Sequence, residues 1–376
     1  AQGKDADKPT QIWTQGETES SSCWFPTIDK PNQKTTQEIY MTVPKQYVTL
    51  SNGILKSSEN LGENLRTDHW VMDKKHAPYL FFMGVGEYAV IKDKWRNIDV
   101  DYYVEKEYEP YAKQIFGNTP EMIEFFSKKL NYDFPWQKYA QIVGRDYVSG
   151  AMENTTAVIH EESAQQKAGD LADENKWEDV IAHELFHHWF GDLVTAESWS
   201  NLTVNESFAD YSEYLWNEYK YGKDEADYKR LKSLRNSKAD PRNFGKDLVR
   251  FNYESREDMF DGVSYNKGGG ILHMLRNYLG DDAFFAGLSD YLKTNEYGTG
   301  EAHQLRLSLE KVSGKDLNWF FNQWYFGKGY PKLEVKSTFD PMKKQVTVNV
   351  AQTQEEKFEF PLSIDVLENG KISRKE

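Results

Sequence analysis

Residues 183–189 read HELFHHW, which contains the pattern HExxH: two histidines with three residues between them, the first followed directly by a glutamate. The surrounding run, residues 177–193, has the pattern of a helix. An α-helix turns once in about 3.6 residues, so His183 and His187 are expected on one face, one turn apart. Two imidazoles at this spacing can bind one Zn²⁺, while Glu184 beside them is free to act as a general base.

A third ligand is expected from Glu206, which follows His187 by nineteen residues and lies in a second predicted helix. Two histidines and one glutamate leave the fourth position of zinc open to water, which is typical of catalytic and not of structural sites. HExxH alone leaves a core helix with three histidines as an equal alternative, and the downstream glutamate favours the metal. We therefore expect one Zn²⁺ per chain. His188 and His160 lack ligand spacing to the other residues and are placed outside the site.

Composition limits the class of protein. A chain of 376 residues is too long for one small core, so two or three domains are expected. The net charge of −14 argues against a nucleic-acid partner, and no apolar run is long enough to span a membrane. The single cysteine, Cys23, excludes an intrachain disulfide and a cysteine-based metal cluster. Residues 1–9 are too polar for a signal peptide, and cytoplasmic, periplasmic and secreted locations all stay open.

The chain divides into three parts by its hydrophobic pattern. Residues 1–103 alternate short apolar segments with polar loops, which predicts a β domain. Residues 104–332 have mainly helical periodicity with a few short strands, and they contain HExxH. From residue 333 to residue 376 an alternation of period two returns, as in the first strands of a β-sandwich. The predicted fold class is multidomain α+β.

Three further motifs accompany HExxH. Residues 150–154 read GAMEN, residues 264–268 read SYNKG with Tyr265 at the start of a predicted helix, and residues 14–17 read TQGE. Together these motifs resemble the zinc aminopeptidase family of aminopeptidase N and leukotriene hydrolase, the gluzincins with the pattern HExxH-18-E. GAMEN upstream of HExxHxW is highly specific to that family. The resemblance runs from about residue 11 to residue 376, nearly the whole chain.

The resemblance implies a layout of four domains: an N-terminal β domain, a thermolysin-like catalytic domain, a small β-sandwich and a C-terminal helical domain that roofs the site. On this basis residues 1–103 are an incomplete N-terminal domain, residues 104–332 the catalytic domain and residues 333–376 a piece of the sandwich. The helical domain is absent from the sequence. Selection of substrates by size is left open, because in relatives the helical domain closes the cavity.

The resemblance also implies roles in catalysis. His183, His187 and Glu206 would hold the metal at roughly 2.0–2.2 Å. Glu184 would take a proton from the metal-bound water and later hand it to the leaving amine. Tyr265 matches the family tyrosine that donates a hydrogen bond to the tetrahedral oxyanion.

An acid is expected to bind the free amino end of a peptide. A free α-amino group is a cation near neutral pH, and a dry cleft binds it only against a carboxylate. The resemblance gives this role to Glu153 of GAMEN, with Glu17 of TQGE as a second acid and Gln15 beside it. Such a site would reject internal peptide bonds, which offer no cation.

The other GAMEN residues are expected to hold the rest of the substrate. Gly150 and Ala151 would align the peptide as an added strand through their backbone groups. Met152, together with Gln15, would form a wall of the pocket for the first side chain. Asn154 completes the substrate-binding motif.

Metal-binding imidazoles usually donate their second N–H to a carboxylate or a carbonyl. Asp210 and Glu213 follow Glu206 by four and seven residues, on the same face of the predicted helix. Either acid could orient a histidine, and the sequence does not choose between them.

The function that these motifs predict is a zinc-dependent aminopeptidase that removes single residues from peptides with a free N-terminus. One alternative is a bifunctional epoxide hydrolase and aminopeptidase, as in one branch of the resembling family. Another is an inactive relative that serves as a scaffold. The last alternative is disfavoured, because the three ligands, the base and Tyr265 are all present.

Overall fold

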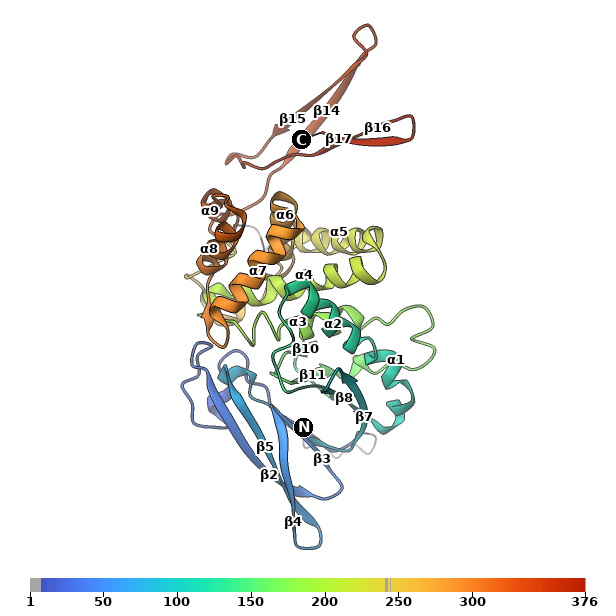
Figure 1. The fold of residues 1–376 in the computed structure, drawn as a ribbon, viewed down its shortest axis with the longest axis vertical. Helices are drawn as coiled ribbons and strands as arrows, with labels where there is room; N and C mark the ends of the chain where they lie inside the picture. Colours follow the sequence, from blue (N-terminus) through green and yellow to red (C-terminus); the bar gives the residue numbers. More distant parts are fainter. Residues whose placement is uncertain (1–7, 241–242, 244, 376) are drawn as a thin grey trace.

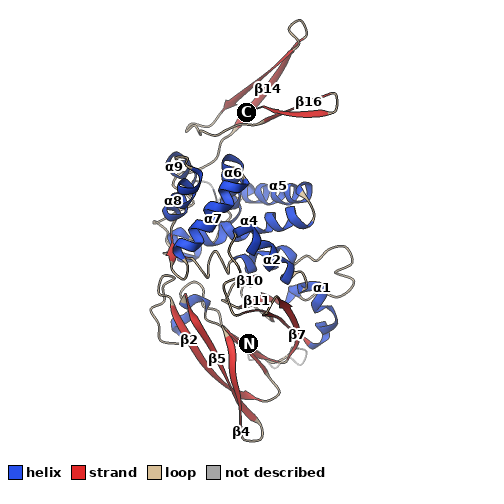
Figure 2. Cartoon of the chain, viewed as in Figure 1, coloured by secondary structure: helices blue, strands red, loops and turns tan. Residues whose placement is uncertain are grey.

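The computed structural model describes residues 8–240, 243 and 245–375. Figure 1 shows an elongated molecule in which the sheets of the N-terminal part lie at one end and helices fill the middle. Two hairpins of the C-terminal part project from the other end, so strands dominate both ends of the molecule (Figure 2). The structure therefore has the multidomain α+β architecture that the sequence predicts.

Along the described chain, eight strands come before the first α-helix and four strands follow the last one. The strands are β1 (Gln11–Trp13), β2 (Thr35–Pro44), β3 (Val48–Ser51), β4 (Ile54–Leu61), β5 (Leu65–His76), β6 (Met83–Gly86), β7 (Tyr88–Trp95), β8 (Ile98–Glu105), β9 (Lys138–Gly144), β10 (Ala151–Met152), β11 (Ala157–Glu161), β12 (Thr195–Ala196), β13 (Thr299–Gly300), β14 (Leu333–Asp340), β15 (Gln345–Gln352), β16 (Ile364–Glu368) and β17 (Lys371–Lys375). The α-helices are α1 (Ala112–Phe116), α2 (Thr119–Leu130), α3 (Glu178–Phe186), α4 (Thr203–Lys220), α5 (Lys223–Ala239), α6 (Gly268–Leu279), α7 (Asp281–Asn295), α8 (Ala302–Ser313) and α9 (Asn318–Trp324). A π-helical turn, η8 (Val263–Lys267), leads directly into α6. In the described part of the chain, no helix combines the length and the apolar character that crossing a bilayer requires.

Two three-stranded sheets form the N-terminal part, with the strand orders β1-β6-β3 and β2-β5-β4. Along β2 the side chains alternate between exposed and buried positions, as expected for strands with one face toward a core. The buried side chains, among them Met41, Leu50 and Trp70, form one cluster that continues onto Ala140 and Ile159 of the next sheet. The N-terminal part therefore packs on the central part through a shared apolar core.

The central sheet has five strands in the order β10-β11-β9-β8-β7. Strands β8, β9 and β11 run parallel, whereas β7 and β10 pair antiparallel at the two edges. The predicted domain boundary between residues 103 and 104 falls inside β8, and both β7 and β8 belong to this sheet. We propose that the boundary lies before Tyr88, because a break within β8 would divide a hydrogen-bonded ladder between two domains.

The HExxH stretch lies on α3, which packs between α2 and α4. Helix α3 ends at Phe186, whereas the sequence predicts a helical run to residue 193. The difference arises because the N–H groups of His188 and Trp189 bond to carbonyls three residues back, which tightens the last turn. His187 still has helical backbone angles, so its side chain stays one turn from His183. Phe190 then stacks on Phe208 of α4, with ring centroids 4.1 Å apart.

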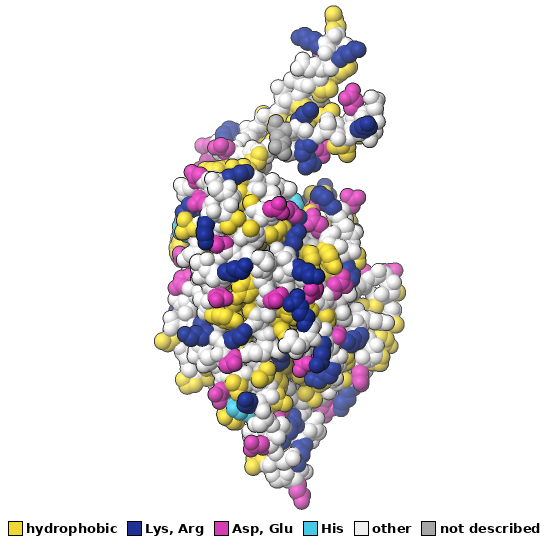
Figure 3. All heavy atoms as spheres, in the orientation of Figure 1, with side chains coloured by type: hydrophobic (Ala, Val, Ile, Leu, Met, Phe, Trp, Pro, Cys, Tyr) yellow, Lys and Arg dark blue, Asp and Glu magenta, His cyan; other side chains and the backbone are white. Residues whose placement is uncertain are grey.

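The C-terminal part, residues 333–375, forms two hairpins, β14-β15 and β16-β17, each a separate two-stranded sheet. Every described residue of this part is exposed or partly exposed, including the apolar Phe339, Val346 and Ile372. Figure 3 shows apolar side chains along the projecting hairpins. The predicted strands are thus present, and in the structure they form hairpins.

Truncation of Phe190 tests whether its stack on Phe208 is a main contact between the α3 segment and α4. Phe190 is fully buried, and loss of a buried phenylalanine typically lowers the free energy of unfolding by about 3–5 kcal/mol. We expect a loss of this size for Phe190→Ala in urea-induced unfolding. Phe251→Ala, at a side chain that is 72% exposed, is the matched control and should change the free energy by less than about 0.5 kcal/mol. Equal effects of the two variants would contradict this assignment.

Candidate active site

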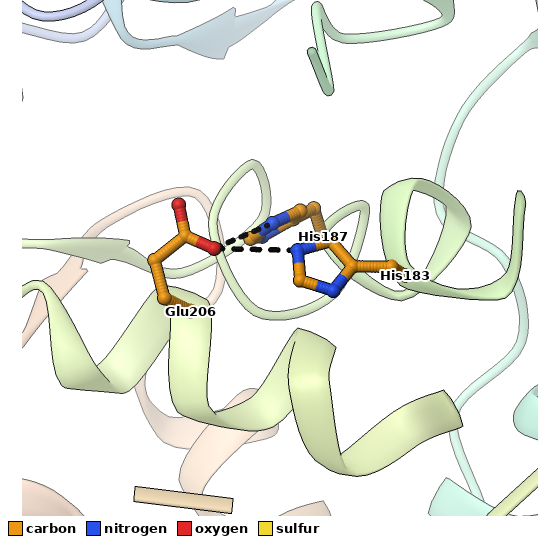
Figure 4. A group of neighbouring side chains, drawn as sticks. All are labelled: His183, His187 and Glu206. Carbon is orange, nitrogen blue, oxygen red and sulfur yellow. Dashed lines mark hydrogen bonds and ion pairs between the residues drawn. The ribbon is translucent and has the colours of Figure 1, made fainter. Parts of the chain in front are cut away.

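Three side chains of the predicted ligand set converge between α3 and α4. Glu206 lies in the first turn of α4, and its Oε2 is 3.3 Å from Nε2 of His183 and 3.3 Å from Nε2 of His187. Figure 4 shows the carboxylate facing both imidazoles. The three ligand atoms lie within 4.8 Å of one another, so the group could hold a metal ion.

The second ring nitrogen of each histidine contacts an acceptor. His183 Nδ1 lies 2.9 Å from Glu213 Oε1, and His187 Nδ1 lies 3.0 Å from the carbonyl oxygen of Phe190. A carbonyl oxygen only accepts, so His187 Nδ1 carries a proton. The Nε2 of that ring is therefore the nitrogen that faces the ligand group, and it is the atom that a metal would take after losing its proton.

The donor set of the group fits zinc. Two imidazole nitrogens and one carboxylate oxygen are ligands that zinc takes in catalytic sites. Around a tetrahedral zinc at about 2.0–2.1 Å, neighbouring ligand atoms lie about 3.3–3.4 Å apart, which agrees with the 3.3 Å separations of Glu206 Oε2. Burial works to raise the pKa of Glu206, but the charge of His187 and the hydrogen bonds from both histidines outweigh it and hold the pKa at about 2. Glu206 therefore presents an anionic oxygen.

Glu184 and Glu153 lie beside the same imidazole. Oxygen atoms of these two acids and a nitrogen of His187 also lie within 4.8 Å of one another. Burial raises the pKa of Glu184 to about 8, against the opposing charges of the two nearby histidines. Glu184 Oε2 is buried and has no hydrogen-bond partner among the described residues. A carboxyl with a raised pKa and an unused oxygen beside a ligand group is suited to proton transfer.

A second acid reaches Glu153 from the N-terminal part. Burial raises the pKa of Glu17 well above its usual range, and the charge of Glu153 adds to the rise. Glu17 Oε1 is buried and finds no partner in the described chain. Gly16 lets the chain just before Glu17 lie against Tyr79, since a Cβ at that position would lie 2.3 Å from the carbonyl oxygen of Tyr79. The structure thus brings the TQGE and GAMEN motifs together.

Tyr265 lies in the π-helical turn η8, and its ring stacks on that of His183 with centroids 6.0 Å apart. Burial and the charge of Glu206 raise the pKa of Tyr265 well above its usual range, so the hydroxyl keeps its proton. Ser207 Oγ donates to a carbonyl of η8 at 2.5 Å and so joins the turn to α4. Gly268 makes this joint possible, because a Cβ there would lie 1.8 Å from Ser207 Oγ. The tyrosine is therefore held next to the ligand group.

The GAMEN residues lie at an edge of the central sheet. Ala151 and Met152 form β10, whose one partner strand among the described residues is β11, so its outer edge is open. Gly150 precedes this strand and is exposed. Gln15 Nε2 lies 3.5 Å from Met152 Sδ, as expected for two residues of one pocket wall. Asn154 is buried, and neither atom of its amide has a partner in the described part of the chain.

Comparison with protein-family models identifies the chain. Residues 115–324 match the model of the peptidase family M1 domain, and residues 2–80 match that of the peptidase M1 N-terminal domain. The chain belongs to peptidase family M1. The two matched ranges of this M1 chain contain TQGE, GAMEN, HExxH and Tyr265, and they confirm the family that these motifs predict.

Curated relatives match most of this M1 chain. Tricorn protease-interacting factor F2 of Thermoplasma acidophilum is 30% identical over 348 residues, 87% of this chain and 42% of the relative. Aminopeptidase M1 of Arabidopsis thaliana is 29% identical over 346 residues, 88% of this chain and 38% of the relative. The chain spans less than half the length of these relatives. The crystal structure of Legionella pneumophila aminopeptidase A in complex with aspartic acid shares the fold, with a TM-score of 0.79 at 22% identity over 90% of this chain and 40% of that chain.

Some contacts of the site are not predicted by the sequence. Tyr79 Oη donates to Glu153 Oε1 at 3.4 Å, and Asn205 Nδ2 donates to Tyr79 Oη at 3.3 Å. His188, which lacks ligand spacing, bonds to the backbone on both sides of the site. Tyr79 lies far from the motifs in the sequence and has no such signal. The sequence signals are the positions of Asn205 directly before Glu206 and of His188 directly after His187.

Substitution of Glu213 tests which acid orients His183. Glu213 contacts His183 Nδ1, whereas Asp210 accepts a hydrogen bond from Asn266. Removal of the outer partner of a metal-binding histidine typically weakens metal affinity about 10- to 100-fold, and we expect this loss for Glu213→Ala in a zinc competition titration with a chelating indicator. Asp210→Ala is the control and should retain most of the affinity. A larger loss of zinc affinity for Asp210→Ala than for Glu213→Ala would assign the orienting role to Asp210.

Proposed function

We propose that this M1 chain is the catalytic part of a zinc-dependent aminopeptidase, which hydrolyses the first peptide bond of peptides with a free N-terminus. The observation that carries the proposal is that Glu153, Glu184 and His187 share one buried cluster, with ligand atoms within 4.8 Å of one another. An acid for a terminal ammonium thus lies within reach of the peptide bond that a base would attack. The name of the Arabidopsis relative, aminopeptidase M1, agrees with the proposal.

His183, His187 and Glu206 would hold Zn²⁺ through two nitrogens and one oxygen, and their 3.3 Å separations support this assignment. When bound, zinc would supply a Lewis acid and lower the pKa of a water molecule to near 7. Glu213 and the carbonyl of Phe190 would keep both imidazoles oriented with Nε2 toward the metal.

Glu184 would act as general base and then as general acid. Its Oε2, which has no other partner among the described residues, would accept a proton from water and deliver it to the nitrogen of the leaving amine. A group with a pKa near the working pH both gains and loses a proton readily, and the pKa of Glu184 is about 8. Tyr265 would donate a hydrogen bond to the oxyanion of the tetrahedral intermediate, an interaction worth on the order of 3 kcal/mol.

Glu153 and Glu17 would bind the α-ammonium group of the substrate. Two buried acids whose charges repel each other gain a favourable interaction when a cation enters between them. The open edge of β10 would align the peptide backbone as an added strand. Because an internal peptide bond brings no cation to the two acids, hydrolysis would release one residue at a time.

The alternative functions have less support. An inactive scaffold would be expected to lack a ligand, the base or the tyrosine, yet all of these side chains gather in one place in this structure. No contact described above favours an epoxide hydrolase activity in addition.

Release of a fluorophore from a fluorogenic leucine amide tests the proposal. Activity should depend on zinc and disappear with a chelator, and the N-acetylated amide should be cleaved far more slowly because its N-terminus carries no charge. Glu153→Ala should raise KM by about tenfold or more, since a hydrogen bond to a charged group contributes about 1.5–3 kcal/mol, with the zinc content unchanged. Equal rates on the free and the acetylated amide would contradict the proposal.

Glutamine at position 184 tests the general base. An amide of the same size cannot take up a proton, so Glu184→Gln should lower kcat by about 10²–10⁴-fold. Bound zinc, measured by elemental analysis, should stay at one ion per chain. Glu59→Gln, at an exposed acid of β4, is the control and should behave like wild type. Substantial turnover of Glu184→Gln at full zinc content would show that another group is the base.

A further inference from the structure

The ring of His188 links two parts of the site that lie far apart in the sequence. The residue is fully buried and follows α3 by two positions. Its Nε2 lies 2.9 Å from the backbone nitrogen of Thr156, two residues beyond GAMEN, and its Nδ1 lies 3.2 Å from the carbonyl oxygen of Glu184. His188 therefore bridges the backbone of the proposed base and the loop that carries the proposed amine anchor.

The two partners fix the protonation of the ring. The N–H of Thr156 can only donate, so Nε2 accepts and carries no proton. The carbonyl of Glu184 can only accept, so Nδ1 carries the proton. One neutral tautomer therefore makes both hydrogen bonds.

Thr156 has an unusual backbone conformation. Its φ is +66°, a left-handed value that is unfavourable for a β-branched residue and persists only where the surroundings impose it. Lys138 Nζ donates to the carbonyl oxygen of Thr156 at 2.9 Å, and the N–H of Gly53 donates to its hydroxyl at 2.8 Å. His188 accepts the remaining N–H, so the loop after GAMEN is clamped at this one residue.

Aromatic neighbours hold the ring of His188 in place. Phe134 stacks on it with centroids 5.6 Å apart, and Tyr139 meets it edge-on at 4.9 Å. Trp136 Nε1 donates to the carbonyl oxygen of His188 at 2.9 Å. The ring is thus confined on several sides, and rotation cannot replace a hydrogen bond that a substitution removes.

We propose that His188 is a positioning residue that sets the separation between the amine anchor Glu153 and the base Glu184. The inference rests on the proposed function of the site. Glu153 lies three residues before Thr156, and Glu184 lies four residues before His188, so the bridge closes a short path between the two acids. Through this path the histidine determines which peptide bond of a bound substrate lies over the base.

Two substitutions separate the two hydrogen bonds. In His188→Gln the amide oxygen occupies about the position of Nε2 and still accepts the Thr156 N–H. In His188→Asn the amide lies near the position of Nδ1, where it can donate to the Glu184 carbonyl but cannot reach Thr156. His160→Asn is the matched control, because His160 is equally buried and its Nε2 contacts Gln141.

The readouts are KM and kcat on leucine amide, and the ratio of kcat/KM between this substrate and the same amide without the α-amino group. The variants are compared in the whole chain, with zinc content measured and at a temperature where each is folded. His188→Asn should raise KM by about tenfold or more and lower the ratio similarly, because an unpaired buried N–H and a displaced anchor each have effects of at least this size. His188→Gln and His160→Asn should keep both quantities within about threefold of wild type.

A merely structural role would lower kcat/KM for both substrates alike. A KM and a substrate ratio of His188→Asn that equal those of His160→Asn would therefore overturn the proposal. Equal losses in His188→Gln and His188→Asn would also overturn it, because the bond to Thr156 would then have no special effect. Wild-type protein that cleaves none of a panel of amino-acid amides would refute the proposed function itself, and this assignment with it.

Discussion

One oxygen of Glu206, 3.3 Å from two imidazole nitrogens, is the interaction around which the centre of this molecule is built. A buried carboxylate is costly unless hydrogen bonds or opposite charges compensate for the lost water, and here both histidines do so. This requires a fixed spacing between α3 and α4, to which the stack of Phe190, four residues after α3, on Phe208 of α4 contributes. Helix α4 also carries Glu213 toward His183 and anchors the turn that bears Tyr265. Helix α4 thus positions Glu206 of the ligand group, the acid that contacts His183, and the turn that bears the proposed oxyanion donor.

The other half of the site comes from separate parts of the fold. Glu17 belongs to the N-terminal part and Glu153 to the edge of the central sheet, while Glu184 lies on α3. Their burial in one place raises the pKa of each, and repulsion among the acids adds to the effect of burial. Such crowding of acids opposes folding, and it is typical of functional sites where a cation is the natural counterpart.

Periodicity and short motifs predict the part of the site that lies on one helix or in one loop. The spacing of His183 and His187 follows from 3.6 residues per turn, and the family resemblance carried by GAMEN points to the proposed amine pocket. The place of β7 and β8 in the central sheet is not predicted, because strand pairing over many residues depends on the whole fold. His188 is missed for a related reason: both of its partners are backbone groups, which every residue carries.

Strand β10 is only two residues long, and its outer edge is unpaired among the described residues. A long exposed edge would recruit any extended chain, including a second copy of the same protein, and would favour intermolecular sheets. Two residues offer too little backbone for such a sheet to start, yet enough for one or two residues of a visiting peptide. The short length of this strand thus allows an unpaired edge to accept a peptide strand without favouring aggregation.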